Sequence, residues 1–267
     1  MLQVYLSGRL FGARFGEGPV RVVALHGWGR SHRDYEPAFG RGIVDEGLAP
    51  IPASVVAVDL PGFGASPPPV EPWSTAGYGQ LIADLIEEVA TDSVVVVGHS
   101  FGGRVAARLA ASRGDLVAGL VLAGVPLRLA GAGAGRPVRR PAVRFRVARS
   151  LSRWGLVSEG TMERARRRYG SADYGAASGV MREVLVRTVQ EVYDDDLARI
   201  ACPVEIVWGE NDTEVGVESA RLLAGVLKRS RLRVVPGAGH LIPTEVPGAL
   251  LGTTVEVLEE AGIGRCH

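Results

Sequence analysis

The sequence contains 267 residues, 46% of them hydrophobic, and carries a formal net charge of +1. A chain of this length and apolar content can bury a full core without metal or disulfide support, which argues against a disordered protein. The near-zero charge argues against an overall electrostatic attraction to nucleic acid or to a membrane surface. Two cysteines, Cys202 and Cys266, are too few for a disulfide framework.

The N-terminal segment has no apolar run long enough for a signal peptide. No segment approaches the ~20 apolar residues that span a bilayer. We therefore expect a cytoplasmic protein without a transmembrane segment. Lys228 is the single lysine among 30 basic residues, a bias that we attribute to genomic composition before function.

Short apolar runs alternate with helix-like segments in the first half of the chain. Residues 20–27, 54–64, 93–98 and 116–124 are predicted strands, and their continuous β-branched runs are typical of strands covered on both faces. Residues 74–90 begin with a Ser/Thr cap and place apolar side chains at helical spacing, which predicts a helix. Strands and helices in alternation predict a parallel sheet with right-handed crossovers.

The alternation stops after residue 126 and resumes near residue 200. Residues 127–199 contain no convincing buried strand, so we predict a helical insertion there, between core segments 1–126 and 200–267. The second core segment reads as two strands and two helices, at 202–209, 217–228, 230–237 and 246–262. The predicted fold class is α/β, with a mostly parallel central sheet flanked by helices.

Residues 98–102, Gly-His-Ser-Phe-Gly, stand where a buried strand passes into a helix with almost no loop. Such a turn forces Ser100 into a strained backbone conformation and needs small residues on either side, which explains Gly98 and Gly102. The strain lifts the Ser100 hydroxyl clear of the sheet edge and directs the N–H of Phe101 at the group under attack. The helix N-terminus adds positive potential. This layout predicts that Ser100 is a nucleophile.

A serine nucleophile needs a base to take its proton, and His240 is the predicted base. It lies in "PGAGHLIP", a loop after a late strand, from which it can reach over the sheet edge. His99 is expected to point into local packing, and His26, at a strand end, is expected to be structural.

The base in turn needs a carboxylate that fixes its tautomer, and Asp212 is the predicted one. It lies in "WGENDTEV", just past a strand, with room for a helix and one strand before His240. Glu210 and the acidic run at 194–196 are weaker candidates. Asp59 is expected to hold its own turn.

Acyl transfer also needs hydrogen-bond donors for an oxyanion. We predict that the backbone N–H groups of Phe101 and Trp28 supply them, because the glycines of "HGWG" let the Trp28 N–H face the serine. The side chains of Trp28, Phe63 and Trp154 are expected to shape the substrate pocket.

The motifs "LHGWG", "VDLPGFGAS", "VGHSFGG", "WGENDTEV" and "GAGH" occur in the order typical of α/β-hydrolase-fold serine enzymes. The sequence resembles that superfamily over nearly the whole chain outside the insertion. The resemblance implies the α/β-hydrolase fold with a helical cap after the sixth strand, which matches residues 127–199. A serine nucleophile, rather than an aspartate, speaks against the epoxide hydrolase and haloalkane dehalogenase branches.

"HGWG" together with "DLPGFG" also resembles the methyl ester esterases that act on a pimeloyl carrier protein and use a basic cap to meet it. Residues 127–170 hold twelve arginines against Glu159 and Glu163. The Arg-rich cap therefore either forms solvated helix faces or meets an acidic substrate, a carrier protein or a membrane surface. "GHSFGG" departs from the nucleophile motif of those esterases.

Other chemistries lack their residues. The single lysine leaves no P-loop, and "GAGAG" at 131–135 follows no clear strand, which disfavours a dinucleotide site. No His/Cys cluster has metal-ligand spacing, and the basic segment lacks the interleaved aromatic residues of a nucleic-acid platform. We therefore expect no cofactor, no metal and no nucleic-acid partner.

The predicted function is a carboxylesterase-like serine hydrolase that cleaves an ester, thioester or lactone of a small molecule. Two alternatives keep Ser100, Asp212 and His240. One is a C–C lyase or elimination enzyme of the same fold, in which the three residues act as a base without an acyl-enzyme. The other is a small-molecule receptor or signalling protein with vestigial hydrolase activity.

Overall fold

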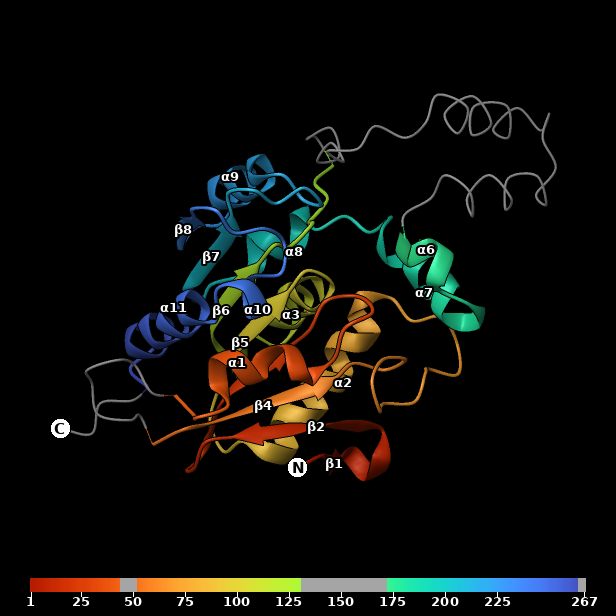
Figure 1. Ribbon diagram of the computed structural model, residues 1–267, viewed down its shortest axis with the longest axis horizontal. Helices are drawn as coiled ribbons and strands as arrows, with labels where there is room; N and C mark the ends of the chain where they lie inside the picture. Colours follow the sequence, from red (N-terminus) through yellow and green to blue (C-terminus); the bar gives the residue numbers. More distant parts are fainter. Residues whose placement is uncertain (44–51, 131–171, 264–267) are drawn as a thin grey trace.

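A central sheet of eight strands runs through the computed structural model, which describes residues 1–43, 52–130 and 172–263 (Figure 1). The strands are β1 (Gln3–Tyr5), β2 (Leu10–Phe15), β3 (Val20–Leu25), β4 (Ser54–Asp59), β5 (Val94–His99), β6 (Val117–Ala123), β7 (Val204–Gly209) and β8 (Ser230–Val235). Their order across the sheet is β1-β2-β4-β3-β5-β6-β7-β8. The pairs β1–β2 and β2–β4 are antiparallel, and the other neighbouring pairs are parallel. The predicted fold class is confirmed.

The continuous valine run of β5 follows from burial on both faces of the sheet. Val94 and Val96 pack into one hydrophobic cluster, and Val95 and Val97 pack into the other. All six residues of the strand are buried. Alternate side chains of a strand point to opposite faces, so a strand covered on both sides needs apolar residues at every position.

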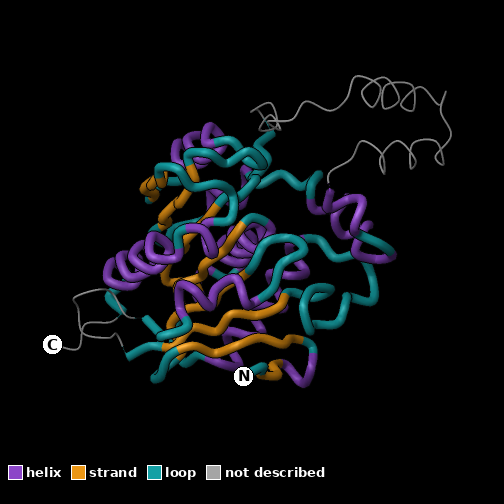
Figure 2. The backbone as a smooth tube through the Cα atoms, viewed as in Figure 1, coloured by secondary structure: helices purple, strands orange, loops and turns teal. Residues whose placement is uncertain are grey.

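Helices cover the two faces of the sheet in separate layers (Figure 2). One layer contains α2 (Thr75–Val89), α3 (Phe101–Ser112), α8 (Asp194–Arg199) and α9 (Val217–Val226). The other contains α1 (Glu36–Phe39), α10 (Ile242–Glu245) and α11 (Pro247–Glu260). Short 3-10 turns, η1 (Leu6–Gly8), η2 (His32–Tyr35) and η3 (Gly114–Leu116), link these elements.

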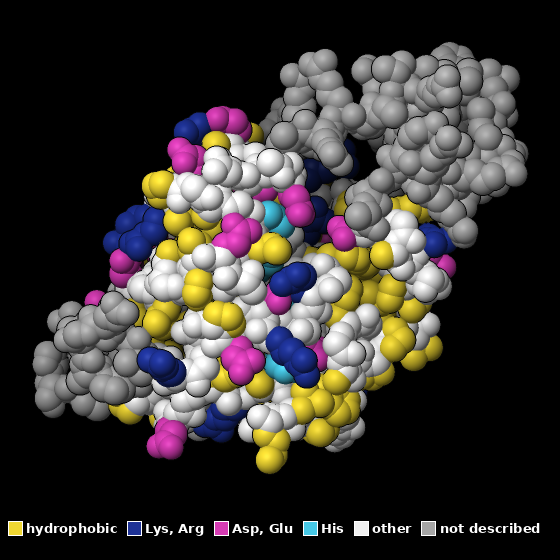
Figure 3. Space-filling view, in the orientation of Figure 1, with side chains coloured by type: hydrophobic (Ala, Val, Ile, Leu, Met, Phe, Trp, Pro, Cys, Tyr) yellow, Lys and Arg dark blue, Asp and Glu magenta, His cyan; other side chains and the backbone are white. Residues whose placement is uncertain are grey.

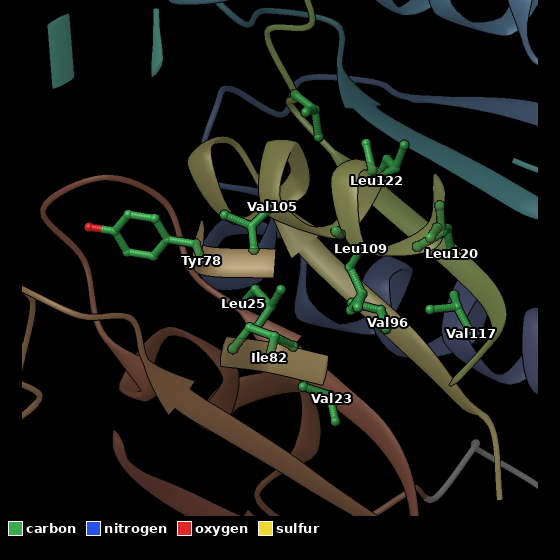
Figure 4. Close-up of a cluster of buried hydrophobic side chains, with 14 of the residues drawn as sticks. Val23, Leu25, Tyr78, Ile82, Val96, Val105, Leu109, Val117, Leu120 and Leu122 are labelled. Carbon is green, nitrogen blue, oxygen red and sulfur yellow. The ribbon is translucent and has the colours of Figure 1, made fainter. Parts of the chain in front are cut away.

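The larger cluster fills the space between the sheet and helices α2 and α3. Figure 4 shows Leu25 and Val96 from the sheet meeting Ile82 of α2 and Leu109 of α3. All four are fully buried or nearly so. Burying side chains of this kind contributes about 1.5–3 kcal/mol each, so this layer holds α2 and α3 firmly against the sheet.

Strands β1 and β2 were not predicted from the sequence. Gly12 and Arg14 interrupt the apolar run of β2, and Val4 of β1 is exposed. Because β1 lies at the sheet edge, it lacks the fully apolar pattern of the inner strands. Gly12 permits close pairing, since a Cβ there would overlap the carbonyl oxygen of Ala57 in β4.

The predicted insertion at 127–199 is described in part, at residues 127–130 and 172–199, and these contain no strand. Helices α6 (Ala172–Ala176) and α7 (Gly179–Thr188) lie beside the core (Figure 1). The division into core and cap remains a prediction, because residues 131–171 are outside the described ranges. Trp154, expected in the pocket, falls within that segment, as does most of the Arg-rich stretch.

Polar contacts hold the boundaries of the predicted insertion against α3. Arg104 of α3 donates hydrogen bonds to the carbonyl oxygens of Pro126 (3.1 Å) and Thr188 (3.0 Å). Arg108, one turn later, pairs with the buried carboxylate of Asp196. The two arginines therefore tie the residue just before the predicted insertion, and the C-terminal part of the insertion, to the helix that follows Ser100.

Candidate active site

Ser100 lies at the turn between β5 and α3 with φ 48° and ψ −110°, a backbone conformation that residues other than glycine rarely adopt. Strain of this kind costs of order 1–3 kcal/mol and persists only where the surroundings enforce it. Here the Ser100 N–H donates to the carbonyl oxygen of Ala123 at the end of β6 (2.9 Å). The helix begins at the next residue, Phe101.

The glycines around Ser100 allow the helix start to press against the strands. A Cβ on Gly98 would lie 2.5 Å from the Cα of Gly103. A Cβ on Gly102 would overlap the carbonyl oxygen of Leu25, and the Gly102 N–H donates to the carbonyl oxygen of His26 (3.0 Å). The spacing Gly-x-Ser-x-Gly is therefore a packing requirement of this turn.

His240 and Asp212 form a buried hydrogen-bonded pair. His240 Nδ1 lies 2.7 Å from Asp212 Oδ2. The other carboxylate oxygen of Asp212 accepts the backbone N–H groups of Glu214 and Val215, each at 2.8 Å. Asp212 follows β7, and His240 lies between β8 and α10, so two loops at the carboxyl edge of the sheet bring them together.

The backbone of His240 is fixed beside the Ser100 turn. His99 Nε2 donates to the carbonyl oxygen of His240 (2.9 Å), and the two imidazole rings lie 4.9 Å apart. A Cβ on Gly124 would lie 3.0 Å from His240 Cε1, and Gly124 follows the residue that bonds the Ser100 N–H. The end of β6 thus contacts both the predicted nucleophile and the predicted base.

The pKa of His240 is raised above its ordinary value. Burial acts to lower it, but the hydrogen bond to Asp212 and the negative charges of Asp212, Glu214 and Glu245 together outweigh burial. An imidazole in this setting holds its proton to a higher pH than usual, and its charged form is stabilised. That favours a base that must carry a positive charge during a reaction.

The loop after β3 adjoins Ser100 on another side. A Cβ on Gly27 would lie 2.8 Å from His99 Nδ1 and 3.4 Å from Ser100 Cβ. Gly29 has φ 69°, which lets the chain turn sharply after Trp28. The N–H of Trp28, predicted as an oxyanion donor, therefore belongs to a loop in contact with Ser100. The N–H of Phe101 belongs to the first residue of α3.

Aromatic rings gather beside this turn. We call Trp28, Phe63, Tyr78 and Phe101 the aromatic cluster. Trp28 lies 4.8 Å from Phe63 and 5.3 Å from Phe101, between ring centroids, and Tyr78 lies 5.2 Å from Phe101. Trp28 also packs against the apolar side chains of Tyr174 and Leu185 in α6 and α7. The cluster therefore joins the Ser100 turn to the described part of the predicted cap.

The other acidic candidates are engaged elsewhere. Glu210 accepts the Gly237 N–H, and Asp196 pairs with Arg108. Asp59 accepts hydrogen bonds from His32 and from the N–H of Ala65 in its own turn. Asp212 is thus the sequence candidate that contacts His240.

Two further histidines are buried in structural roles. His26 Nδ1 bonds the carbonyl oxygen of Gly27 (2.7 Å), and its Nε2 accepts the Leu60 N–H (2.9 Å). Burial lowers the pKa of His26 to about 4. Burial, together with the charge of His240, lowers the pKa of His99 to about 3. Both rings are therefore neutral near pH 7.

Sequence reasoning missed two carboxylates near His240. Glu214 Oε2 lies 3.6 Å from His240 Nε2. The pKa of Asp173 in α6 is raised by burial and by the charge of Glu214, against an opposing effect of His240. Glu214 lies only two positions after Asp212 in the sequence, but no sequence pattern indicates where its side chain points. Asp173 is far from Asp212 in the sequence, and no pattern relates it to His240.

In the parts of the chain that the structure describes, His, Cys, Asp and Glu side chains do not gather in groups of three or more that could bind a metal ion. No helix within those same ranges has the length and apolar character needed to cross a bilayer.

The α/β-hydrolase fold class is defined by features that this structure has. They are a mostly parallel eight-stranded sheet, a strained serine turn after β5 and a His–Asp pair at the same edge of the sheet. The chain matches the model of the Alpha/beta hydrolase family over residues 22–252. It therefore belongs to that family.

Individual relatives carry hydrolase names. Lipase LipV of Mycobacterium tuberculosis is 41% identical over 110 residues, which span 41% of this chain and 39% of the lipase. The 2-hydroxy-6-oxononadienedioate/2-hydroxy-6-oxononatrienedioate hydrolase of Cupriavidus pinatubonensis is 25% identical over 84% of this chain and 82% of its own. A thermophilic esterase from Thermogutta terrifontis superposes with a TM-score of 0.66 at 25% identity, covering 94% of this chain and 93% of its own. The names of these relatives mention no carrier protein, so the expected carrier-protein partner of the Arg-rich cap has no support from them.

Proposed function

We propose that the protein is a serine hydrolase that cleaves an ester, thioester or lactone of a small molecule through an acyl-enzyme on Ser100. The observation that carries this proposal is the buried His240–Asp212 pair, 2.7 Å between Nδ1 and Oδ2, beside the strained Ser100 turn. Membership of the family and the esterase and lipase names of its relatives support the reaction class.

In the proposed mechanism, Ser100 Oγ attacks the substrate carbonyl while His240 Nε2 takes its proton. Asp212 keeps a proton on Nδ1, so Nε2 is free to accept one, and its charge then stabilises the imidazolium. The backbone N–H groups of Phe101 and Trp28 donate to the oxyanion. His240 returns the proton to the leaving group, and water cleaves the acyl-enzyme with the same imidazole as base.

The aromatic cluster supports an apolar acyl group. Phe101 and Trp28 adjoin the Ser100 turn, and Phe63 packs against both rings. Trp28 and Phe63 are only partly buried. Burying their remaining apolar surface contributes about 25 cal/mol per Å², so a substrate with a hydrocarbon acyl chain gains affinity there.

Hydrolysis of a p-nitrophenyl ester series, from acetate to decanoate, tests the proposal with Ser100→Ala alongside. We expect a chain-length optimum in the wild type and a fall in kcat of on the order of 10⁴- to 10⁶-fold in the variant. Circular dichroism checks that both proteins fold alike. Activity near the wild-type level in Ser100→Ala would overturn the mechanism.

Cleavage of a carbon–carbon bond is a second candidate, because the hydrolase of Cupriavidus pinatubonensis aligns with 84% of this chain. Its name describes a keto acid rather than an ester. In such a reaction His240 would act as a base on the substrate, without an acyl-enzyme. Trapping an acyl-enzyme by rapid acid quench after mixing with an ester separates the two candidates.

A further inference from the structure

The two ring nitrogens of His240 face different carboxylates. Nδ1 is bonded to Asp212, and Nε2 lies 3.6 Å from Glu214 Oε2. In the proposed function Nε2 is the nitrogen that takes the proton from Ser100. Glu214 therefore lies close to the nitrogen that acts as the base in the proposed function, and our inference rests on that function.

The loop that holds Asp212 also fixes Glu214. The backbone N–H of Glu214 donates to Asp212 Oδ1 (2.8 Å), and so does that of Val215. The Glu214 side chain is 65% exposed, whereas the His240 side chain is 8% exposed. The carboxylate thus reaches from solvent toward a nearly buried ring, and its backbone is anchored to the same aspartate that orients the ring.

Negative charge surrounds His240 from several elements. Asp212 and Glu214 come from the loop after β7, and Glu245 comes from α10, where it accepts the N–H groups of Gly239 and Leu241. Asp173 of α6 interacts electrostatically with the ring, and the neutral His99 of β5 lies beside it. Acidic and histidine side chains also lie side by side on the face drawn in Figure 3.

We propose that Glu214 is a positioning residue for His240: its carboxylate engages the Nε2 N–H of the protonated ring and competes with Ser100 for that nitrogen. While the ring is protonated and no substrate is bound, the carboxylate lies beside its Nε2 N–H. When the proton leaves, the contact weakens, and Nε2 becomes available to Ser100.

The consequence is a dependence of activity on Glu214 that is electrostatic rather than structural. Removing its charge should make the imidazolium less stable, so His240 should become neutral at a lower pH. Because Glu214 is largely exposed, solvent screens the interaction. The expected displacement is about half a pH unit at low salt and should shrink at about 1 M salt.

The experiment is the pH profile of kcat/KM between pH 5 and 9, on the best p-nitrophenyl ester, for wild type, Glu214→Gln and Glu214→Asp. Glu218→Gln is the matched control, because Glu218 pairs with Arg221 and its side chain is 76% exposed. We expect the acid limb to move down in Glu214→Gln, less in Glu214→Asp, and not in Glu218→Gln. An unmoved limb in Glu214→Gln, or an equal shift in Glu218→Gln, overturns the proposal.

A second measurement keeps this outcome separate from the proposed function. NMR titration of the His240 ring in the Ser100→Ala background needs no turnover and compares Glu214 with Gln directly. A lower titration midpoint in the Gln variant supports the positioning role even if no ester is hydrolysed. Equal midpoints overturn it even if the wild type is an active esterase.

Discussion

His240 Nδ1 and Asp212 Oδ2 lie 2.7 Å apart, and both residues are buried. Asp212 accepts two backbone N–H groups on its other oxygen, so its carboxylate cannot rotate freely. The pair therefore fixes which ring nitrogen of His240 carries a proton. This relationship makes the identity of residue 212 decisive for the proposed chemistry.

Asp212→Asn should lower kcat by about 10⁴-fold while the protein still folds. The amide oxygen can accept the N–H groups of Glu214 and Val215, so the loop is retained. The amide N–H₂ then faces His240 Nδ1, which forces the proton onto Nε2 and removes the base. The measurement is kcat at pH 8 with thermal unfolding as the control. A variant within tenfold of the wild type would contradict the role of Asp212.

Ser100→Gly should be more stable than Ser100→Ala by about 1 kcal/mol, the reverse of the usual order. Both variants lose the hydroxyl, so the comparison isolates the backbone at φ 48°. Glycine adopts this conformation without strain, and alanine does not. Urea unfolding at pH 7.5 measures the difference. Alanine proving more stable would mean that the turn relaxes when the hydroxyl is removed.

Gly102→Ala should destabilise the protein by about 3 kcal/mol or more. A Cβ there overlaps the carbonyl oxygen of Leu25, which belongs to a central strand and has no room to move. Gly225→Ala is the control, because a Cβ added to this residue of α9 would meet nothing within 4 Å. That change should raise stability by up to about 1 kcal/mol. Similar effects of the two substitutions would refute the close-packing account.

Acid should destabilise the fold through its buried neutral histidines. The pKa values of His26 and His99 are about 4 and about 3 in the fold, against about 6.5 in an unfolded chain. As the pH falls below about 6.5, the unfolded chain binds protons first, so stability falls between about pH 6.5 and pH 4. Each ring contributes up to about 3 kcal/mol to that loss.

His26→Gln checks this by urea unfolding at several pH values between 4 and 8. The variant should be less stable at pH 7.5, because it loses a hydrogen bond, yet should lose less stability on acidification. His240 is common to both proteins, so its opposite contribution cancels. Parallel stability curves would show that His26 is not responsible.

The inner strands were predictable because burial on both faces demands continuous apolar residues, as in β5. Strands β1 and β2 were not, since Gly12 and Arg14 break the pattern at a position near the sheet edge. The serine turn was predictable because its glycines are imposed by local packing. Asp212 and Glu210 lie in one loop, and the tertiary contact with His240 is what separates them.

The interactions of Glu214 and Asp173 with His240 had no sequence signal. They depend on how the loop after β7, helix α6 and the loop before α10 meet in space. The local pattern of hydrophobic residues does not predict contacts between elements that are far apart in the sequence. Trp154 lies outside the described residues, so its expected place in the pocket stays a prediction.

The most direct test of the central claim is to label the wild-type protein with a fluorophosphonate and locate the adduct by peptide mass spectrometry. We predict one adduct, on Ser100, that is absent from Ser100→Ala and much slower to form in Asp212→Asn. An adduct on another residue, or none in a folded wild-type protein, would contradict the assignment of Ser100 as an activated nucleophile.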